Sequence, residues 1–264
     1  MEFDFITNID IFSWQGILLL IVAGFFVGII NTIAGSGTVI TYSLFMLMGL
    51  PAGAANGTIR LGVIMQTLAA SLNFKRKKIL EIKNGLIIAV PTIAGTILGA
   101  FIAIQINEDI FEKIIGGVMI IMLALIFYKP ERWIKGKESL RKNRKPYLQA
   151  IIFFAIGIYG GFIHIGVGIF LLAGLVLFAG YDLLKANALK VFIVFLYSPF
   201  ALAVFILNDQ VHYGMGLVSA IGNLAGGLVA SGFAMEWGAK FIRWFLIIVI
   251  ILFAAKLMGL FELI

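Results

Sequence analysis

The sequence predicts an all-α polytopic membrane protein built from two inverted five-segment repeats with broken or hairpin helices. Of its 264 residues, 62% are hydrophobic and only 12% are charged, whereas soluble domains carry about 25% charged residues. Ten apolar segments follow one another along the chain, and most approach the ~20 residues that a helix needs to cross a bilayer. Glycine-rich breaks recur at matching places in the two halves, which indicates a duplication.

The ten apolar segments are predicted to be helices, in two groups of five. They cover residues 16–34, 38–50, 54–74, 84–106, 110–128, 147–165, 167–180, 186–207, 213–235 and 240–259. Segments 38–50 and 167–180 are short for a crossing of about 30 Å of hydrocarbon. Each follows a glycine-rich stretch, so we expect each to form a hairpin with the long segment before it.

The basic residues set the predicted orientation. Residues 75–83 carry five basic residues and one acidic residue, and residues 129–146 carry eight basic and two acidic. Positive loops remain on the cytoplasmic side, so both segments are predicted to be cytoplasmic and both termini external. The net charge of +7 is therefore a loop bias and not a nucleic-acid surface.

The two halves match at a constant offset of 131 residues. The pairs are Gly35 and Gly166, Gly37 and Gly168, Gly49 and Gly180, Ala55 and Ala186, and Asn56 and Asn187. We predict a first repeat over 1–128, a cytoplasmic basic loop over 129–146 and a second repeat over 147–264. The basic turn 75–83 corresponds to 206–214, which has no Lys or Arg, so the second repeat should be inverted. Chance matching in a glycine-rich chain is the alternative.

The glycine breaks are candidate anion-binding sites. Non-helical backbone at membrane depth occurs where protein or a water-filled cavity surrounds it, and the N–H groups that begin a half-helix hold anions. The stretches NTIAGSGT and HIGVG provide the candidates Asn31, Gly35, Ser36, Gly37, Thr38, His164, Gly166 and Gly168. The alternative is that these are ordinary turns at the membrane surface, with Ser36 and Thr38 as helix caps.

Two basic residues lie inside predicted spans at nearly matching positions, Arg60 and Lys190. A cation there costs about 2.5–3.5 kcal/mol, so we expect a compensating partner. The hypothesis is a partly hydrated anion pocket to which Asn56 and Asn187 also contribute. The alternatives are cations that reach the membrane interface and asparagines that are helix N-caps. His164 could carry a proton, bind an anion or form a hydrogen bond between helices.

No catalytic, cofactor or metal site is predicted, and the chain is predicted not to be an enzyme. It has no cysteine and two histidines, and two histidines without supporting carboxylates make no metal site. No carboxylate lies deep in a predicted span, which argues against a cation pump.

The stretch GFFVGIINTIAGSGTVITYSLFMLMGLPAGAANGTIR, with its weaker counterpart GIYGGFIHIGVGIFLLAGLVLFAGYDLLKANALK, resembles the TauE/SafE family of membrane anion permeases, often called sulfite exporters. The likeness covers roughly residues 16–259 and implies transport of sulfite or of organosulfonates such as sulfoacetate. Breaks in this family usually have the pattern G-x-G-G. Ser36 interrupts the first break here, and the second differs as well, so the preferred anion stays open.

The sequence therefore predicts a secondary transporter, an exporter of small sulfur-containing anions that works by alternating access in the cell (inner or plasma) membrane. Its predicted partners are a small anion and the lipid bilayer. The sequence leaves open whether the protein forms a homo-oligomer and whether transport is coupled to a proton or a sodium ion. The alternatives are a transporter or channel for another small solute, such as a weak acid or inorganic ion, and a membrane scaffold. A continuous helix through Gly35 would favour the scaffold.

Overall fold

The computed structural model describes residues 13–106, Ile110 and residues 146–257, with side chains described as far as Ala234 and at Glu236. Within these ranges the chain is helical and contains no strand, which confirms the all-α prediction. The predicted segment 110–128 lies outside the described residues except for Ile110. The basic loop 129–146 lies outside them except for Pro146.

Four described helices come from the predicted first half (residues 1–128). They are α2 (Trp14–Ile33), α3 (Thr38–Leu47), α4 (Ala52–Arg76) and α5 (Ile82–Gln105). Helix α3, with 10 residues, is roughly 15 Å long, about half the thickness of the hydrocarbon region. It therefore fits a hairpin with α2 and is too short for a complete crossing.

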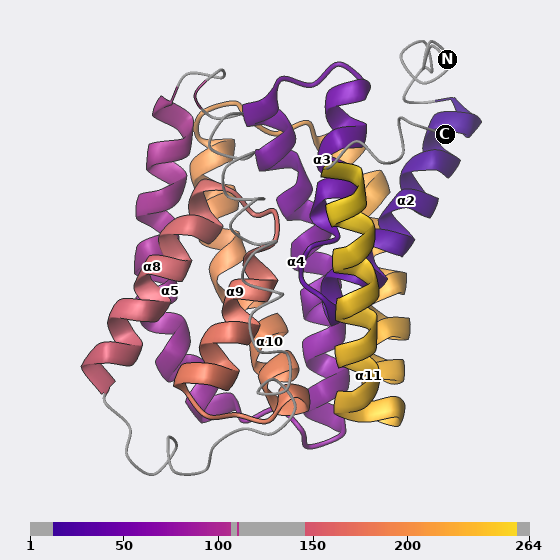
Figure 1. Ribbon diagram of the computed structural model, residues 1–264. Helices are drawn as coiled ribbons and strands as arrows, with labels where there is room; N and C mark the ends of the chain where they lie inside the picture. Colours follow the sequence, from indigo (N-terminus) through magenta and orange to yellow (C-terminus); the bar gives the residue numbers. More distant parts are fainter. Residues whose placement is uncertain (1–12, 107–109, 111–145, 258–264) are drawn as a thin grey trace.

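The described helices of the second half (residues 147–264, with Pro146) follow the same order of long, short and long elements. They are α8 (Pro146–Phe162), α9 (Val167–Ala173), the π-helix η2 (Gly174–Phe178), α10 (Leu183–Ile206) and α11 (Tyr213–Leu257). Helix α11 joins the two predicted segments 213–235 and 240–259 without a break. A straight helix of its 45 residues would be roughly 67 Å long, but Figure 1 shows that α11 reverses direction near the bottom of the view.

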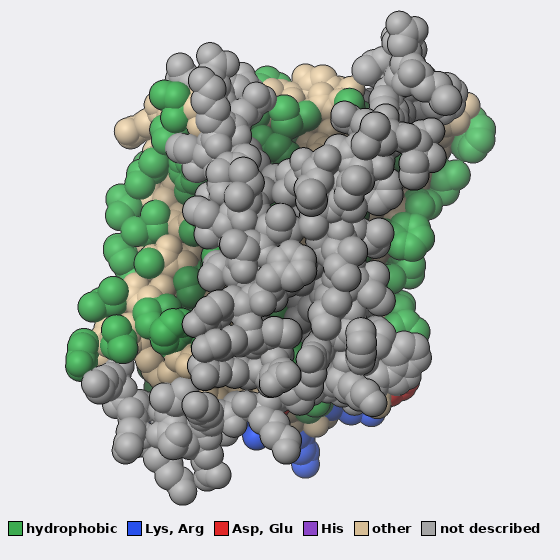
Figure 2. All heavy atoms as spheres, viewed as in Figure 1, with side chains coloured by type: hydrophobic (Ala, Val, Ile, Leu, Met, Phe, Trp, Pro, Cys, Tyr) green, Lys and Arg blue, Asp and Glu red, His purple; other side chains and the backbone are tan. Residues whose placement is uncertain are grey.

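The surface of the helix bundle is suited to lipid. Four helical stretches are long and apolar enough to cross a membrane, namely α2, α5, α10 and Tyr213–Ala234 of α11. Large apolar side chains point outward from them, including Val90, which is 68% exposed, and Ile221, which is 61% exposed. In Figure 2 hydrophobic side chains cover the visible flanks, and Lys and Arg side chains gather at the lower end. This arrangement is that of a polytopic membrane protein.

The two ends of the bundle differ in charge. Exposed basic residues at positions 75–78 lie in the last turn of α4 and directly after it. The turn between α10 and α11 lies at the other end of α4, because the His212 N–H donates to Thr58 Oγ1 at 2.9 Å. The basic turn 75–83 and the corresponding turn 206–214 thus face opposite sides of the bundle, as an inverted repeat requires. The repeat itself remains a prediction.

Small residues allow each half to pack closely on the other. Gly99 of α5 lies against the Ile158 carbonyl of α8, and Gly226 of α11 lies against the Phe25 carbonyl of α2. A Cβ at either glycine would overlap the facing backbone. Small residues at helix interfaces are the usual means of close association in membranes. The last described helix of each half therefore packs on the first helix of the other half.

This packing predicts different effects for two Gly→Ala changes on α11. Gly226→Ala forces α2 and α11 apart and should destabilise the fold by about 1–3 kcal/mol. Gly232→Ala is the matched control, because a Cβ there meets no atom within 4 Å. Both changes bring the same gain in helix propensity, so the difference between their melting temperatures in detergent micelles isolates the packing. Equal melting temperatures would show that α2 and α11 do not approach this closely.

Candidate functional site

The first glycine break interrupts the backbone between α2 and α3. Helix α2 ends at Ile33, and Gly35 has φ +84°, in the left-handed region where side chains with a Cβ are strained. Helix α3 begins again at Thr38. The helix is thus not continuous through Gly35, and the feature that would have favoured a membrane scaffold is not present.

The second break has the same form. Helix α8 ends at Phe162, Gly166 has φ +72°, and α9 begins at Val167. The four described glycines with positive φ are Gly35, Gly49, Gly166 and Gly180, which form two of the pairs separated by 131 residues. The local backbone is therefore alike at both matched places.

The two breaks meet inside the protein. The Gly168 N–H donates to the Gly35 carbonyl at 3.2 Å, and a Cβ on either glycine would overlap the backbone of the other. Residues 31–38 and 161–169 are all buried. In Figure 1 the open end of the α2–α3 hairpin faces the top of the view and that of α8–α9 faces the bottom. Both breaks are therefore buried inside the protein and are not exposed turns.

Arg60 and Lys190 hold the inner ends of the broken helices. Arg60 of α4 donates from Nη1 to the Gly160 carbonyl at 3.2 Å and from Nη2 to the Gly161 carbonyl at 2.6 Å, near the end of α8. Lys190 Nζ donates to three carbonyls near the end of α2, those of Asn31, Thr32 and Ile33, at 3.2, 2.7 and 3.5 Å. The last carbonyls of a helix lack partners within it and carry partial negative charge. Each half thus supplies the cation that caps the broken helix of the other half.

The helix-end carbonyls are the partners that compensate the cost of burying the two cations. Arg60 is 0% exposed and Lys190 is 1% exposed, so neither reaches the membrane interface and that alternative is wrong. Both η nitrogens of Arg60 bind carbonyls, and its Nε has no partner among the described residues. A guanidinium has five N–H donors, so Nε and the second N–H of each η nitrogen remain for direct contact with an anion.

Neither asparagine is a helix N-cap. Asn56 lies inside α4, where its Nδ2 donates to the Phe162 carbonyl at 2.9 Å. Asn187 lies inside α10, whose N-cap is Asp182, and neither polar atom of its amide has a partner among the described residues. The N-cap alternative is thus wrong at both positions. The two matched asparagines thus differ: the Asn56 amide donates a hydrogen bond, and the Asn187 amide has no hydrogen-bond partner among the described residues.

Several polar side chains at the first break are buried without partners in the described part of the chain. They are the hydroxyls of Thr32, Ser36 and Thr38. The N-cap position of α3 is Gly37, without a side-chain cap, so Ser36 and Thr38 do not cap it as the alternative supposed. A buried polar group without a partner costs about 1–3 kcal/mol, and natural proteins keep few of them. The Asn187 amide is likewise buried and without a partner, and a bound solute or water would satisfy such groups.

The other predicted residues have structural contacts. Asn31 Nδ2 donates to Gln66 Oε1 of α4 at 3.2 Å. Gly37 lies against the Val27 carbonyl of α2, where a Cβ would be 2.7 Å away, so it serves the packing of the hairpin. His164 contacts another helix, because its Nδ1 lies 3.4 Å from Tyr197 Oη of α10.

Two aromatic residues of the site were not predicted from the sequence. Tyr197 contacts His164, and the ring of Phe205 has its centroid 4.7 Å from Arg60 Cζ. Both are fully buried. Tyr197 follows Lys190 by seven residues, so helical spacing places both on the same face of α10. That spacing is the signal that could have identified Tyr197.

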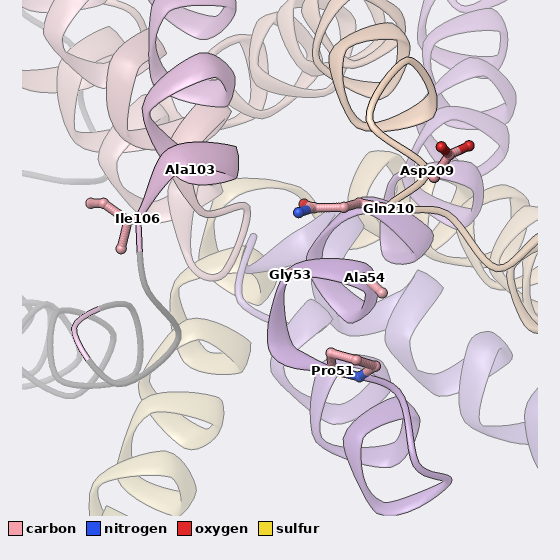
Figure 3. A pocket seen from close by; sticks show the side chains of 7 residues that line it. All are labelled: Pro51, Gly53, Ala54, Ala103, Ile106, Asp209 and Gln210. Carbon is pink, nitrogen blue, oxygen red and sulfur yellow. The ribbon is translucent and has the colours of Figure 1, made fainter.

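A pocket of about 380 Å³ opens at the end of the bundle that carries the α10–α11 turn. Its lining comes from Pro51, Gly53, Ala54, Ala103, Ile106, Asp209 and Gln210. Figure 3 shows Gln210 pointing into this space and the Asp209 carboxylate pointing away from it. Gly53, Gly57 and Arg60 follow at helical spacing on one face of α4, and Phe205 Cβ and the Gln210 carbonyl lie close to Gly57. Phe205 thus lies close to both Gly57 and Arg60.

The chain is similar in sequence to known membrane transporter proteins. A family model described as sulfite exporter TauE/SafE matches residues 20–257. A Sinorhizobium protein named probable membrane transporter protein ORF9 is 31% identical over 241 residues, which are 91% of each chain. A probable membrane transporter protein of Haemophilus influenzae is 28% identical, covering 90% of this chain and 93% of its own. The probable membrane transporter protein YfcA of Escherichia coli is 26% identical, covering 88% and 85%. No solved structure matches the chain.

The contrast between the two asparagines predicts opposite stability effects for one substitution. Asn56→Leu leaves the buried Phe162 carbonyl without its donor and should destabilise the fold by about 1–3 kcal/mol. Asn187→Leu removes an amide without partners and should leave stability unchanged or raise it. Melting temperatures of the two variants in one detergent measure this difference. Equal losses would indicate that Asn187 has a structural partner after all.

Proposed function

The chain belongs to the sulfite exporter TauE/SafE family, and from this premise we propose that it exports small sulfur-containing anions, such as sulfite or sulfoacetate, by alternating access. The family and the transporter names of the relatives support a membrane transporter and not an enzyme. The proposal includes the class of anion, the alternating-access mechanism, the location in the cell membrane and the external position of both termini.

The electrostatics of the breaks favour an anion. Arg60 and Lys190 are the buried charged side chains in the described part of the chain, and no described Asp or Glu is buried. The C-terminal end of a helix carries roughly half a negative charge, so each helix end neutralises only part of the cation that caps it. The remaining positive charge in a low-dielectric interior attracts anions, whereas transport of a cation usually relies on buried carboxylates.

The unpartnered donors at the same place carry the proposal. Ser36, Thr38 and Asn187 are buried and lack partners among the described residues. A sulfite or sulfonate group offers three oxygen acceptors to such a set. Hydroxyl and amide donors next to fixed cations are a suitable site for a small oxyanion.

The pocket supports a route to this site from one side of the membrane. It lies at the end of the bundle opposite to the basic turn 75–83, and this end is external in the predicted orientation. The Phe205 ring lies against Arg60, and both side chains are 0% exposed, so Arg60 is not open to the pocket. Alternating access would require Phe205 and the α10–α11 turn to move away from Gly57, which opens the path along α4.

Uptake by liposomes that contain the purified protein tests the solute class. Labelled sulfoacetate should enter, and unlabelled sulfite should compete with it while chloride does not. Thr38→Val removes an unpartnered hydroxyl and should lower uptake at least about tenfold, since a hydrogen bond to a charged group contributes about 1.5–3 kcal/mol. Thr67→Val is the matched control, because the Thr67 hydroxyl donates to the Val63 carbonyl of its own helix at 2.6 Å. Equal uptake by the two variants, or competition by chloride, would contradict the proposal.

Thiol labelling tests the two sides of the membrane, because the natural chain has no cysteine. Ala54→Cys lies in the pocket, and Lys77→Cys lies in the exposed basic turn. In sealed cells a membrane-impermeant maleimide should modify the cysteine at position 54 and leave the cysteine at position 77 intact until the membrane is opened. Labelling of both in sealed cells, or of position 77 alone, would show that the predicted orientation is wrong.

A further inference from the structure

His164 is a buried titratable group that the anion donors described above do not use. It lies at the second break, is 1% exposed, and its Nδ1 is 3.4 Å from Tyr197 Oη. Histidine is the side chain whose ordinary titration lies nearest to neutral pH. The sequence contains one other histidine, His212, which precedes α11 at the end of the bundle.

The described groups around His164 are cationic or neutral. Arg60 of α4 donates to the Gly160 carbonyl, and Tyr197 Oη lies so close to Gly160 that a Cβ there would be 3.2 Å from it. Tyr159 of α8 donates to the Ile165 carbonyl at 2.5 Å. Arg60, Tyr197 and His164 therefore surround one short stretch of α8, and no described carboxylate is buried near them.

This arrangement opposes a second positive charge when the site is empty. Arg60 already carries one, and repulsion between like charges is strong in a medium of low dielectric constant. An anion bound next to Arg60 reverses the local field, so that an imidazolium becomes favourable. Binding of the anion and binding of the proton then stabilise each other, and this coupling must be reciprocal.

We propose that His164, with Tyr197, is a proton site coupled to the anion site, so that a proton and a divalent oxyanion occupy the transporter together. The proposal rests on the function proposed above. Arg60 and Lys190 each keep only part of their charge after capping a helix end, so a dianion alone would exceed the positive charge at the breaks, and the proton on His164 reduces the difference. The proton enters from the aqueous side to which the site is open and leaves on the other side with the anion.

Tyr197 is a positioning residue in this scheme. An imidazolium has an N–H on both nitrogens, so protonated His164 must donate from Nδ1 to Tyr197 Oη. The tyrosine hydroxyl hydrogen then points away from the histidine and is free for another acceptor. Because Tyr197 Oη lies next to Gly160, where Arg60 is bound, protonation makes an additional donor available next to the guanidinium.

Calorimetric titration of the full-length protein in detergent tests the coupling. The probes are sulfoacetate and sulfate, whose two negative charges do not change near neutral pH, so any proton taken up binds to the protein. Measurement in two buffers of different ionisation enthalpy gives the number of protons bound per anion. The wild type should take up about one proton, and its affinity should fall by about tenfold per pH unit above the titration of His164. His164→Gln should bind the anion more weakly, with no proton uptake and no such pH dependence.

His212→Asn is the matched control. The His212 side chain accepts from the Met215 N–H at 3.2 Å, a contact that asparagine can replace, and this variant should keep the wild-type proton uptake. Tyr197→Phe should bind anion with less than the wild-type proton uptake, which keeps the proposal testable if His164→Gln does not fold. The inference is overturned if the wild type binds the anion without taking up a proton. It is also overturned if proton uptake persists in His164→Gln or is unchanged in Tyr197→Phe. Each of these results leaves the proposed function intact. A wild type that binds neither probe overturns the proposed function and the coupling with it.

Discussion

The contact between a buried cation and the open carbonyls of a broken helix is the interaction on which this structure depends. Helices α2 and α8 end inside the protein, where water does not reach their last carbonyl groups. Lys190 provides the donors for α2, and Arg60, with Asn56, provides them for α8. Each donor comes from the other half of the chain, so neither broken helix can be satisfied without the partner half. Without these cations, the breaks would leave several buried acceptors unpaired, each at a cost of about 1–3 kcal/mol.

The same contacts give the breaks their chemical character. A cation bound to neutral carbonyls keeps part of its charge, and the start of a short helix adds partial positive charge. The side chains of Ser36, Thr38 and Asn187 remain without partners in the described part of the chain, so the fold keeps donors at its centre that contribute nothing to its own stability. Gly35 and Gly168 are in backbone contact, so the two breaks lie side by side, as one proposed site. In the proposed function, structural capping and anion attraction thus arise from the same two side chains.

The length of the hydrophobic segments and the spacing of the glycines were sufficient to predict several features of the fold. The segments 16–34 and 38–50, the break at Gly35 and the intramembrane cations all follow from such patterns, and the structure has them. The partners of the cations could not be predicted, because they are backbone carbonyls about 100 and 158 residues away. Asn56 and Asn187 were candidate N-caps only because their helices begin earlier than hydrophobicity indicates, at Ala52 and Leu183. Aromatic residues such as Tyr197 and Phe205 cannot be told apart from lipid-facing residues until helix packing is known.

In the proposed function, a small oxyanion binds where the two breaks meet. Crystals of the protein grown with selenite, which has the shape of sulfite, would test it directly, since the anomalous scattering of selenium locates the anion and the chain has no cysteine to reduce it. We expect a selenium peak next to Ser36, Thr38 and Asn187. Peaks confined to the exposed basic turn at residues 75–78, with none between the breaks, would contradict it.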